Sequence, residues 1–167
     1  MELSRSQRDE RLTAVELDAW RGMLRIAVWL RRELGQDLLT AHDLSMADYD
    51  FLVRLAEQPD RGMRMAELAD AILQPPSSLT RIARGLEERG LIVRESAESD
   101  GRGTVARLTD AGESIFRQAQ RTHLNGVRER FLAHLTDAQL DGLAEAWRAV
   151  DPRALAGGPD EPRKSKA

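Results

Sequence analysis

The residues best suited to chemistry lie on one face of a short amphipathic segment, residues 77–89. Ser77, Thr80, Arg81 and Arg84 recur there at helical spacing, and no carboxylate interrupts them before position 87. The opposite stripe is apolar and comprises Leu79, Ile82, Ala83 and Leu86. A helix of this kind fits the major groove of DNA, where guanidinium groups bind guanine and hydroxyl groups bind phosphates or bases. The pattern therefore predicts a DNA-reading helix, with an ordinary solvated surface helix as the alternative.

The neighbouring segments predict the elements that hold such a helix in place. An amphipathic run over residues 66–72 is typical of a supporting helix, and prolines at positions 75 and 76 separate it from the reading helix. Gly90 stands at the expected C-cap. Two β-prone runs follow, at residues 91–95 and 104–108, joined by a polar loop with two glycines. The order helix, turn, helix, hairpin predicts a winged helix-turn-helix domain.

The tip of the predicted hairpin carries an acid and a guanidinium group two residues apart. Asp100 is close enough in sequence to steer Arg102 outward, and we expect the two to form a salt bridge. An arginine on an exposed hairpin suits insertion into a narrow minor groove, where the negative potential is enhanced. The hairpin is therefore predicted to be the wing of the domain, with Arg102 as a DNA contact.

In combination these features resemble the MarR family of bacterial winged-helix transcription regulators. The resemblance is carried by the arginine-bearing helix, Gly90, the Asp100-Gly101-Arg102 tip and the sequence Leu108-Thr109-Asp110-Ala111-Gly112. It is strong over residues 63–112 and follows the helix pattern alone elsewhere between 15 and 150. It implies that the base- and phosphate-contacting positions are Ser77, Ser78, Thr80, Arg81 and Arg84, and that the wing pair is Asp100 and Arg102.

Length and composition narrow the class of protein. The 167 residues suffice for one domain with a buried core, or for one domain with added dimerisation helices. The sequence has no cysteine, which excludes a disulfide framework and a thiol redox switch. No apolar run approaches the roughly 18 residues that a membrane span needs, and the N-terminus lacks a hydrophobic signal core. We therefore expect a cytoplasmic protein.

The net charge of −3 is compatible with a DNA partner once it is divided along the chain. Residues 1–63 hold 9 basic and 12 acidic side chains, whereas residues 64–107 hold 7 of each. The local field matters more than the total charge. We expect Arg94 and Arg107 to point outward and to join the arginines of the reading helix and the wing at the DNA. Binding should then be specific and salt-sensitive.

Long amphipathic segments flank the winged domain on both sides. Apolar residues at helical spacing predict an N-terminal helix over about residues 15–41, capping boxes at Ser45 and Thr136 start two further helices, and Thr109 caps another. The first helix and the last two carry more apolar surface than one subunit can bury. This surplus predicts a two-fold homodimer, with a monomeric helical cap as the alternative. Two reading helices about 34 Å apart would then meet successive major grooves of a pseudo-palindromic operator.

The predicted fold class is mainly α with a small β-hairpin wing, a winged helix-turn-helix with N- and C-terminal dimerisation helices. The last residues are rich in glycine and proline and lack periodicity, which is typical of disorder. The predicted segments are a flexible or fraying N-terminus (1–14), an N-terminal dimerisation helix (15–44), the DNA-binding domain (45–108), C-terminal dimerisation helices (109–152) and a disordered tail (153–167).

Catalytic and metal-binding patterns are missing from the sequence. His42, His123 and His134 have no metal-ligand spacing, and no phosphate-binding loop or nucleophile elbow occurs. We therefore expect neither an enzyme nor a cofactor. The family resemblance implies a small aromatic or phenolic effector, bound between the dimerisation helices and the winged domain. The candidate ligand-binding residues are Trp20, His42 and Tyr49, which combine flat apolar surface with hydrogen-bonding groups, with plain core packing as the alternative.

These observations predict a sequence-specific transcriptional regulator that binds double-stranded DNA, most simply a ligand-responsive repressor. The alternative is a winged-helix module that contacts another regulator without reading an operator, since a fold does not by itself define a function. The polar, arginine-bearing face of the reading helix favours DNA, because a protein-docking surface at that place would be apolar.

Overall fold

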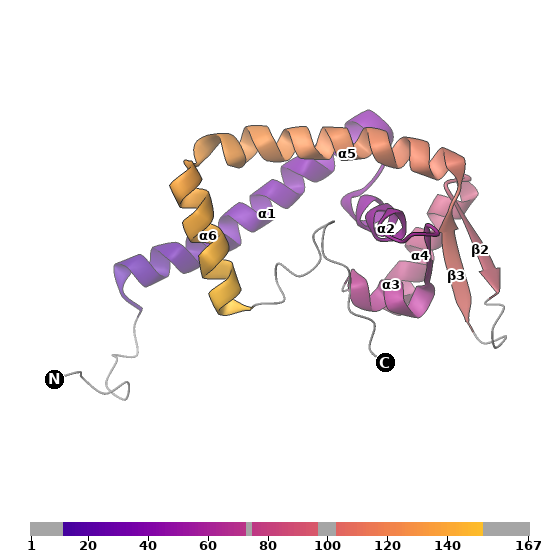
Figure 1. Ribbon diagram of the computed structural model, residues 1–167, viewed down its shortest axis with the longest axis horizontal. Helices are drawn as coiled ribbons and strands as arrows, with labels where there is room; N and C mark the ends of the chain where they lie inside the picture. Colours follow the sequence, from indigo (N-terminus) through magenta and orange to yellow (C-terminus); the bar gives the residue numbers. More distant parts are fainter. Residues whose placement is uncertain (1–11, 73–74, 97–102, 152–167) are drawn as a thin grey trace.

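The computed structural model describes residues 12–72, 75–96 and 103–151 of the chain. The fold is mainly helical with a small antiparallel sheet, as predicted (Figure 1). The elements are, in chain order, α1 (Ala14–His42), α2 (Met46–Ala56), β1 (Gly62–Arg64), α3 (Met65–Ala71), α4 (Pro76–Glu88), β2 (Ile92–Ser96), β3 (Thr104–Leu108), α5 (Asp110–Arg130), the short 3-10 helix η2 (Leu132–His134) and α6 (Asp137–Val150). The predicted wing pair, Asp100 and Arg102, and the predicted tail lie outside the described residues.

Side-chain caps start four of the helices, three of them at the residues that the sequence indicates and one, Thr13, that it did not predict. The capping boxes at Ser45 and Thr136 are formed, and Thr13 makes a third with Glu16 at the start of α1. Thr109 caps α5 by accepting a hydrogen bond from the backbone N–H of Gly112 at 3.0 Å. Each such cap satisfies a helix N–H group that would otherwise lack an intrahelical partner. These four helices, α1, α2, α5 and α6, therefore begin where local chemistry dictates.

The sheet has one strand more than the sequence predicted. The predicted hairpin is confirmed as β2 and β3, which pair antiparallel from Ile92 opposite Leu108 to Ser96 opposite Thr104. The additional strand, β1, pairs with the other edge of β3, so that the strand order is β1-β3-β2. A three-residue strand has too little periodicity to be recognised alone. It forms because β3 offers it hydrogen-bond partners more than forty residues further along the chain.

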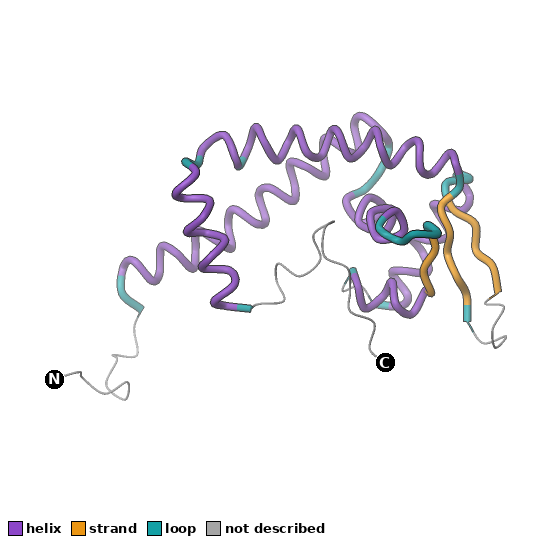
Figure 2. The backbone as a smooth tube through the Cα atoms, in the orientation of Figure 1, coloured by secondary structure: helices purple, strands orange, loops and turns teal. Residues whose placement is uncertain are grey.

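We call α2, α3, α4 and the sheet together the winged module (residues 46–108). The hydrophobic core lies between these elements, and the first half of α5 covers one side of this core (Figure 2). Phe51, Leu52 and Leu55 of α2 are completely buried there. Phe116 and Ala119 bring α5 onto this core. Leu38 of α1 and Leu44 are also buried in this core, so the apolar interior runs continuously from the module into α1 and α5.

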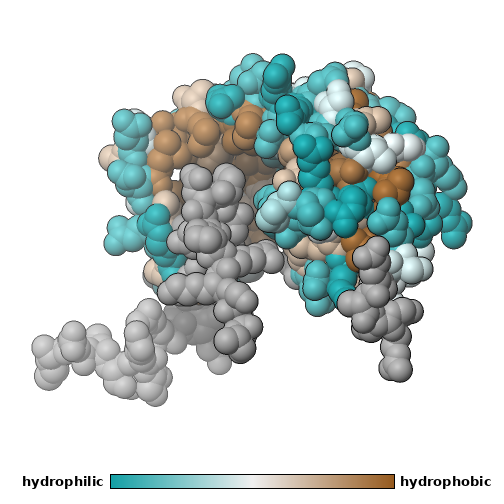
Figure 3. Space-filling view, turned by 45° about the vertical axis from the view of Figure 1, so that its right-hand side comes forward, coloured by the Kyte–Doolittle hydropathy of each residue, from teal (hydrophilic) through white to brown (hydrophobic). Residues whose placement is uncertain are grey.

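A second region, which we call the arm, comprises α6 and residues 14–33 of α1. The structure describes every residue of the arm, and none of them is buried. Large apolar side chains lie exposed there, with 53% of Trp20 and 73% of Val28 accessible. Figure 3 shows this apolar surface gathered at the arm end of the molecule, on the left of the view. None of the helices in the described ranges combines the length and the apolar character that crossing a bilayer requires.

Candidate nucleic-acid interface

Helix α4 presents the predicted reading face to solvent. Its buried stripe is confirmed, and consists of Leu79, Ile82, Ala83 and Leu86. Burial of each larger member of the stripe contributes about 1.5–3 kcal/mol, which fixes the rotation of the helix about its axis. Ser77, Thr80, Arg81 and Arg84 are consequently exposed, and Ser78 is half-buried beside them. Pro76 occupies the first turn of α4, where its missing N–H removes no intrahelical hydrogen bond.

The C-terminal end of α4 is closed by a glycine turn and bonded to α1. Gly90 has a φ of 68°, the left-handed conformation that ends a helix at little cost for glycine. The Leu91 N–H then donates to the Leu86 carbonyl at 2.9 Å. Arg89 donates from Nη2 to the His42 carbonyl at the end of α1, at 3.3 Å. The position of the reading helix is therefore tied to α1 as well as to its own module.

The start of α5 is tied to the same end of α4. The Thr109 hydroxyl donates to the Gly90 carbonyl at 2.8 Å, and the Thr109 N–H donates to the Leu91 carbonyl at 3.1 Å. Gly112 packs so tightly here that a Cβ atom would collide with the Leu91 carbonyl oxygen. The Leu108–Gly112 sequence, which carries part of the family resemblance, is thus the joint between the winged module and the long helix α5.

Arg94 does not stand free beside the reading helix, which corrects the expectation that its charge points outward. Its Nε and Nη2 donate to Glu87 Oε2 at 2.8 and 2.5 Å, and its backbone N–H donates to Oε1 of the same carboxylate at 3.1 Å. The hydrogen bonds from Arg94 hold the pKa of Glu87 below its ordinary value. Glu87 and Arg94 thus neutralise each other at the base of the wing.

Arg107 is also paired, with carboxylates of two segments. Its Nη1 donates to the Asp60 carbonyl at 2.5 Å and to Asp60 Oδ2 at 3.0 Å, and its Nε lies 4.0 Å from Glu95 Oε2. The hydrogen bond from Arg107 lowers the pKa of Asp60. Arg107 therefore links β3 to the loop that precedes β1. A DNA contact by Arg94 or Arg107 stays a prediction, as does one by Arg102, which lies outside the described residues.

The three candidate ligand-binding residues do not converge within one subunit, which corrects that expectation. Trp20 and His42 lie on the same helix, 22 residues apart, a separation of about 33 Å at 1.5 Å per residue. His42 Nε2 lies 2.8 Å from the Thr122 hydroxyl of α5, a hydrogen bond that joins the two helices. Trp20 lies on the exposed arm instead. Packing, the alternative reading, fits His42 better than a shared pocket does.

Tyr49 is part of an aromatic stack between α2 and α5. Its ring centroid lies 6.2 Å from that of Phe116 and 4.8 Å from that of His123. Burial, assisted by the nearby Asp50 carboxylate, raises the pKa of Tyr49 to about 12. Burial lowers the pKa of His123, and the attraction of Asp50 opposes this in part. The sequence predicted no role for His123, because nothing in its neighbours along the chain indicates that it is half-buried against Tyr49.

A shallow pocket of about 450 Å³ opens between α1 and α2. The pocket is lined by Val28, Arg31, Arg32, Gly35, Gln36, Leu39, Ser45 and Met46. Arg31 forms an ion pair with Asp50 of α2 at 2.9 Å, and Arg32 forms one with Glu33 at 2.8 Å. Within the described ranges, His, Asp and Glu side chains form no group of three or more that could hold a metal ion.

A helix-turn-helix followed by an antiparallel hairpin, with a guanidinium-bearing second helix exposed, defines a winged helix-turn-helix protein of the DNA-binding class. The sequence profile of the MarR family matches residues 42–103. AbsC, a MarR family transcriptional regulator from Streptomyces coelicolor, has a crystal structure that aligns with a TM-score of 0.79 and 35% identity, over 90% of this chain and 100% of that one.

Two further relatives carry functional names. Sco3205, a MarR family transcriptional regulator from Streptomyces coelicolor, was crystallised in complex with DNA, and it aligns with a TM-score of 0.79 and 34% identity over 90% of this chain and 93% of that one. The HTH-type transcriptional repressor Rv2887 of Mycobacterium tuberculosis is 29% identical over 117 residues, which cover 70% of this chain and 81% of that protein. The chain belongs to the MarR family of transcriptional regulators, which are DNA-binding proteins.

Proposed function

We propose that this protein is a repressor that binds a pseudo-palindromic operator as a homodimer and releases it when a small effector binds. The observation that carries the proposal is the α4 surface, where Arg81, Arg84 and the hydroxyl groups of Ser77 and Thr80 are exposed opposite a fully packed apolar stripe. These are the groups that read base edges and phosphates in the major groove. The protein would act on the chromosome, in the cytoplasm.

The unburied arm supports the homodimer. An amphipathic helix such as α6, with no buried residue, gains little from folding on its own subunit. A two-fold partner would cover this face together with the exposed apolar side chains of α1, such as Trp20 and Leu24. Such an arrangement brings two α4 helices to one side of the duplex, and a spacing of about 34 Å would match one helical turn of DNA.

The pocket between α1 and α2 is the site that we propose for the effector. Val28, Leu39 and Met46 give it apolar walls, and Arg31 and Arg32 place guanidinium groups at its edge. This chemistry suits an aromatic or phenolic anion, the class that the family resemblance implied. An anion on Arg31 would compete with Asp50 of α2, so that α1 and α2 would shift relative to each other. An effector acts only by binding the two arrangements with different affinity.

The role of α4 is tested by replacing Arg81 with alanine. The Arg81→Ala variant should keep its fold and lose about 1–3 kcal/mol of discrimination between an operator, selected from random duplexes by the wild-type protein, and a scrambled duplex. Arg121→Ala, which removes an exposed arginine from α5, serves as the matched control and should discriminate as the wild type does. Fluorescence anisotropy with labelled duplexes measures both affinities.

A salt series in the same assay separates DNA recognition from protein docking. Direct DNA binding requires the logarithm of the affinity to fall linearly and steeply with the logarithm of the salt concentration. Equal affinity of Arg81→Ala and wild-type protein for both duplexes would refute the role of α4. Wild-type affinity that is weak for every duplex at low salt would refute the operator.

A further inference from the structure

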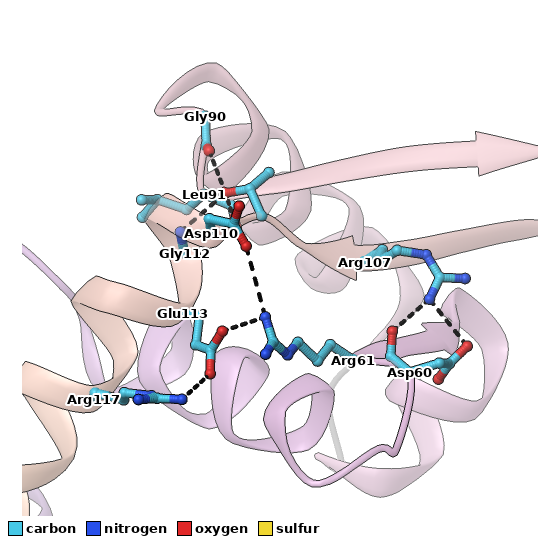
Figure 4. A network of polar contacts seen from close by, with 10 residues as sticks. Asp60, Arg61, Gly90, Leu91, Arg107, Asp110, Gly112, Glu113 and Arg117 are labelled. Atoms are coloured by element: carbon cyan, nitrogen blue, oxygen red, sulfur yellow. Dashed lines mark hydrogen bonds and ion pairs between the residues drawn. The ribbon is translucent and has the colours of Figure 1, made fainter.

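The loop before β1 makes ionic contacts in two directions (Figure 4). Asp60 accepts hydrogen bonds from Arg107 of β3 through both its carbonyl and its carboxylate, at 2.5 and 3.0 Å. The next residue, Arg61, extends to the first turns of α5 instead. Its Nη1 forms an ion pair with Glu113 and lies 3.8 Å from Asp110 Oδ1. Two consecutive residues therefore connect one loop to the sheet and to α5.

The backbone of Arg61 adopts a conformation that arginine seldom takes. Its φ is 55°, in the left-handed region, where glycine or asparagine costs less free energy. The Arg61 carbonyl accepts a hydrogen bond from the Leu108 N–H at 2.9 Å, and the Arg61 N–H donates to the Gln58 carbonyl at 3.0 Å. The loop thus holds this residue in an unfavourable conformation that directs its guanidinium group to α5. The ion pairs give a physical reason for an arginine here.

The contacts of Arg61 cross the joint between the winged module and α5. Leu108 ends β3 and Asp110 begins α5, so Thr109 alone separates strand from helix. Because α5 also packs along α1, the angle between the sheet and α5 determines where α4 and the hairpin lie relative to the arm. A side chain that links the two across a one-residue joint restricts that angle. Glu113 is well placed for this, since only 19% of its side chain is exposed.

We infer that Arg61 is a positioning residue for DNA recognition. Through Glu113 and Asp110 it fixes the angle between the winged module and α5, and thereby the separation of operator half-sites that the dimer accepts. The inference rests on the proposed function, because a half-site separation has meaning only for a dimer on an operator. Arg61 does not read bases in this scheme. It limits which arrangements of the two reading helices are populated.

Three variants isolate this link. Arg61→Gly is the decisive one, because glycine adopts a φ of 55° readily, so the side chain and its ion pairs are removed without strain in the loop backbone. Glu113→Gln removes the partner charge from the other side and leaves the loop intact. Arg117→Ala is the matched control, because Arg117 pairs with the same Glu113 carboxylate from within α5, four residues along, and therefore links no two elements.

The assay measures a ratio of affinities. The wild-type protein first selects a duplex with two half-sites from a random pool. Anisotropy titrations then compare this duplex with two others, in which the same half-sites lie one base pair closer or farther apart. Arg61→Gly and Glu113→Gln should each lower the preference for the selected separation by about fivefold or more, the usual lower range of coupling between distant sites. Arg117→Ala should keep the wild-type preference. Thermal melting, monitored by circular dichroism, checks that each variant is folded.

The possible results separate this inference from the function on which it rests. An unchanged preference in Arg61→Gly and Glu113→Gln would overturn it, even if both variants bound every duplex more weakly. An equal loss of preference in Arg117→Ala would also overturn it, because the effect would then arise from the charge balance at Glu113 and not from a link between the loop and α5. Failure of the wild-type protein to enrich any duplex would instead overturn the proposed function, and the inference with it.

Discussion

The winged module and the arm differ in how they bury apolar residues. Each of α2, α3 and α4 in the module buries side chains against the others, and the sheet and α5 close the core. In the arm, where every residue is described, no side chain is buried and Trp20, Leu24 and Val28 lie exposed. One subunit therefore stabilises its module by itself but leaves the arm incomplete. The difference indicates that recognition and assembly depend on separate sets of contacts.

The largest effect should come from the core of the module. Leu86 is completely buried on the inner face of α4, and its truncation in Leu86→Ala should lower the free energy of unfolding by about 2–5 kcal/mol. The loss should not depend on protein concentration, because the contacts lie within one subunit. Urea denaturation followed by circular dichroism measures it at two concentrations. A loss below about 1 kcal/mol would contradict the close packing of α4 that gives the reading face its orientation.

The sequence predicted much of this module because its signals are local. The 3.6-residue pattern of α4 and the caps at Ser45 and Thr109 depend on residues within a few positions of one another. The strand β1 was missed because the strand that it pairs with is β3, far along the chain. The same reason explains Arg107, whose partner Asp60 lies 47 residues earlier and meets it only when the sheet forms.

The candidate site shows the same limit. The exposed and buried faces of α4 were predicted from periodicity. The outward orientation expected of Arg94 was not found, because the turn at Gly90 brings Arg94 beside Glu87, with which it forms an ion pair. Arg61 carried no sequence signal, because a left-handed backbone is unexpected for arginine. The proposed pocket residues were also missed, since Arg31 and Arg32 are neighbours in an ordinary charged stretch of α1, and the pocket exists only because the fold brings the start of α2 beside them.

An intermediate effect is expected in the arm. If a partner subunit covers this surface, Trp20→Ala should weaken the dimer by about 2 kcal/mol or more, or about thirtyfold in the dissociation constant, as truncation of a central interface tryptophan usually does. Sedimentation across a dilution series measures that constant. Asp18→Ala, an exposed polar change on the same helix, is the control and should leave it unchanged. Equal dissociation of Trp20→Ala and wild-type protein would show that the arm is completed in another way.

The smallest effect should arise where α5 packs on the module. His123 stacks on Tyr49, and its Nδ1 is buried without a hydrogen-bond partner among the described residues, so burial lowers its pKa. The unfolded chain, where the pKa is about 6.5, then binds the proton more tightly than the folded protein does. Stability should be full above this pH and fall as the pH drops toward the lower pKa of the folded state.

The variant His123→Gln should flatten that decline, because glutamine does not titrate. Urea midpoints measured between pH 7 and pH 5 give the slope. The control is His134→Gln, which changes an exposed histidine of η2, shortly before α6, and should keep the wild-type slope. A slope that His134→Gln flattens and His123→Gln does not would place the titrating group outside the contact between α2 and α5. Acid would then act near η2, and the contact between the winged module and α5 would be the region that does not respond to pH.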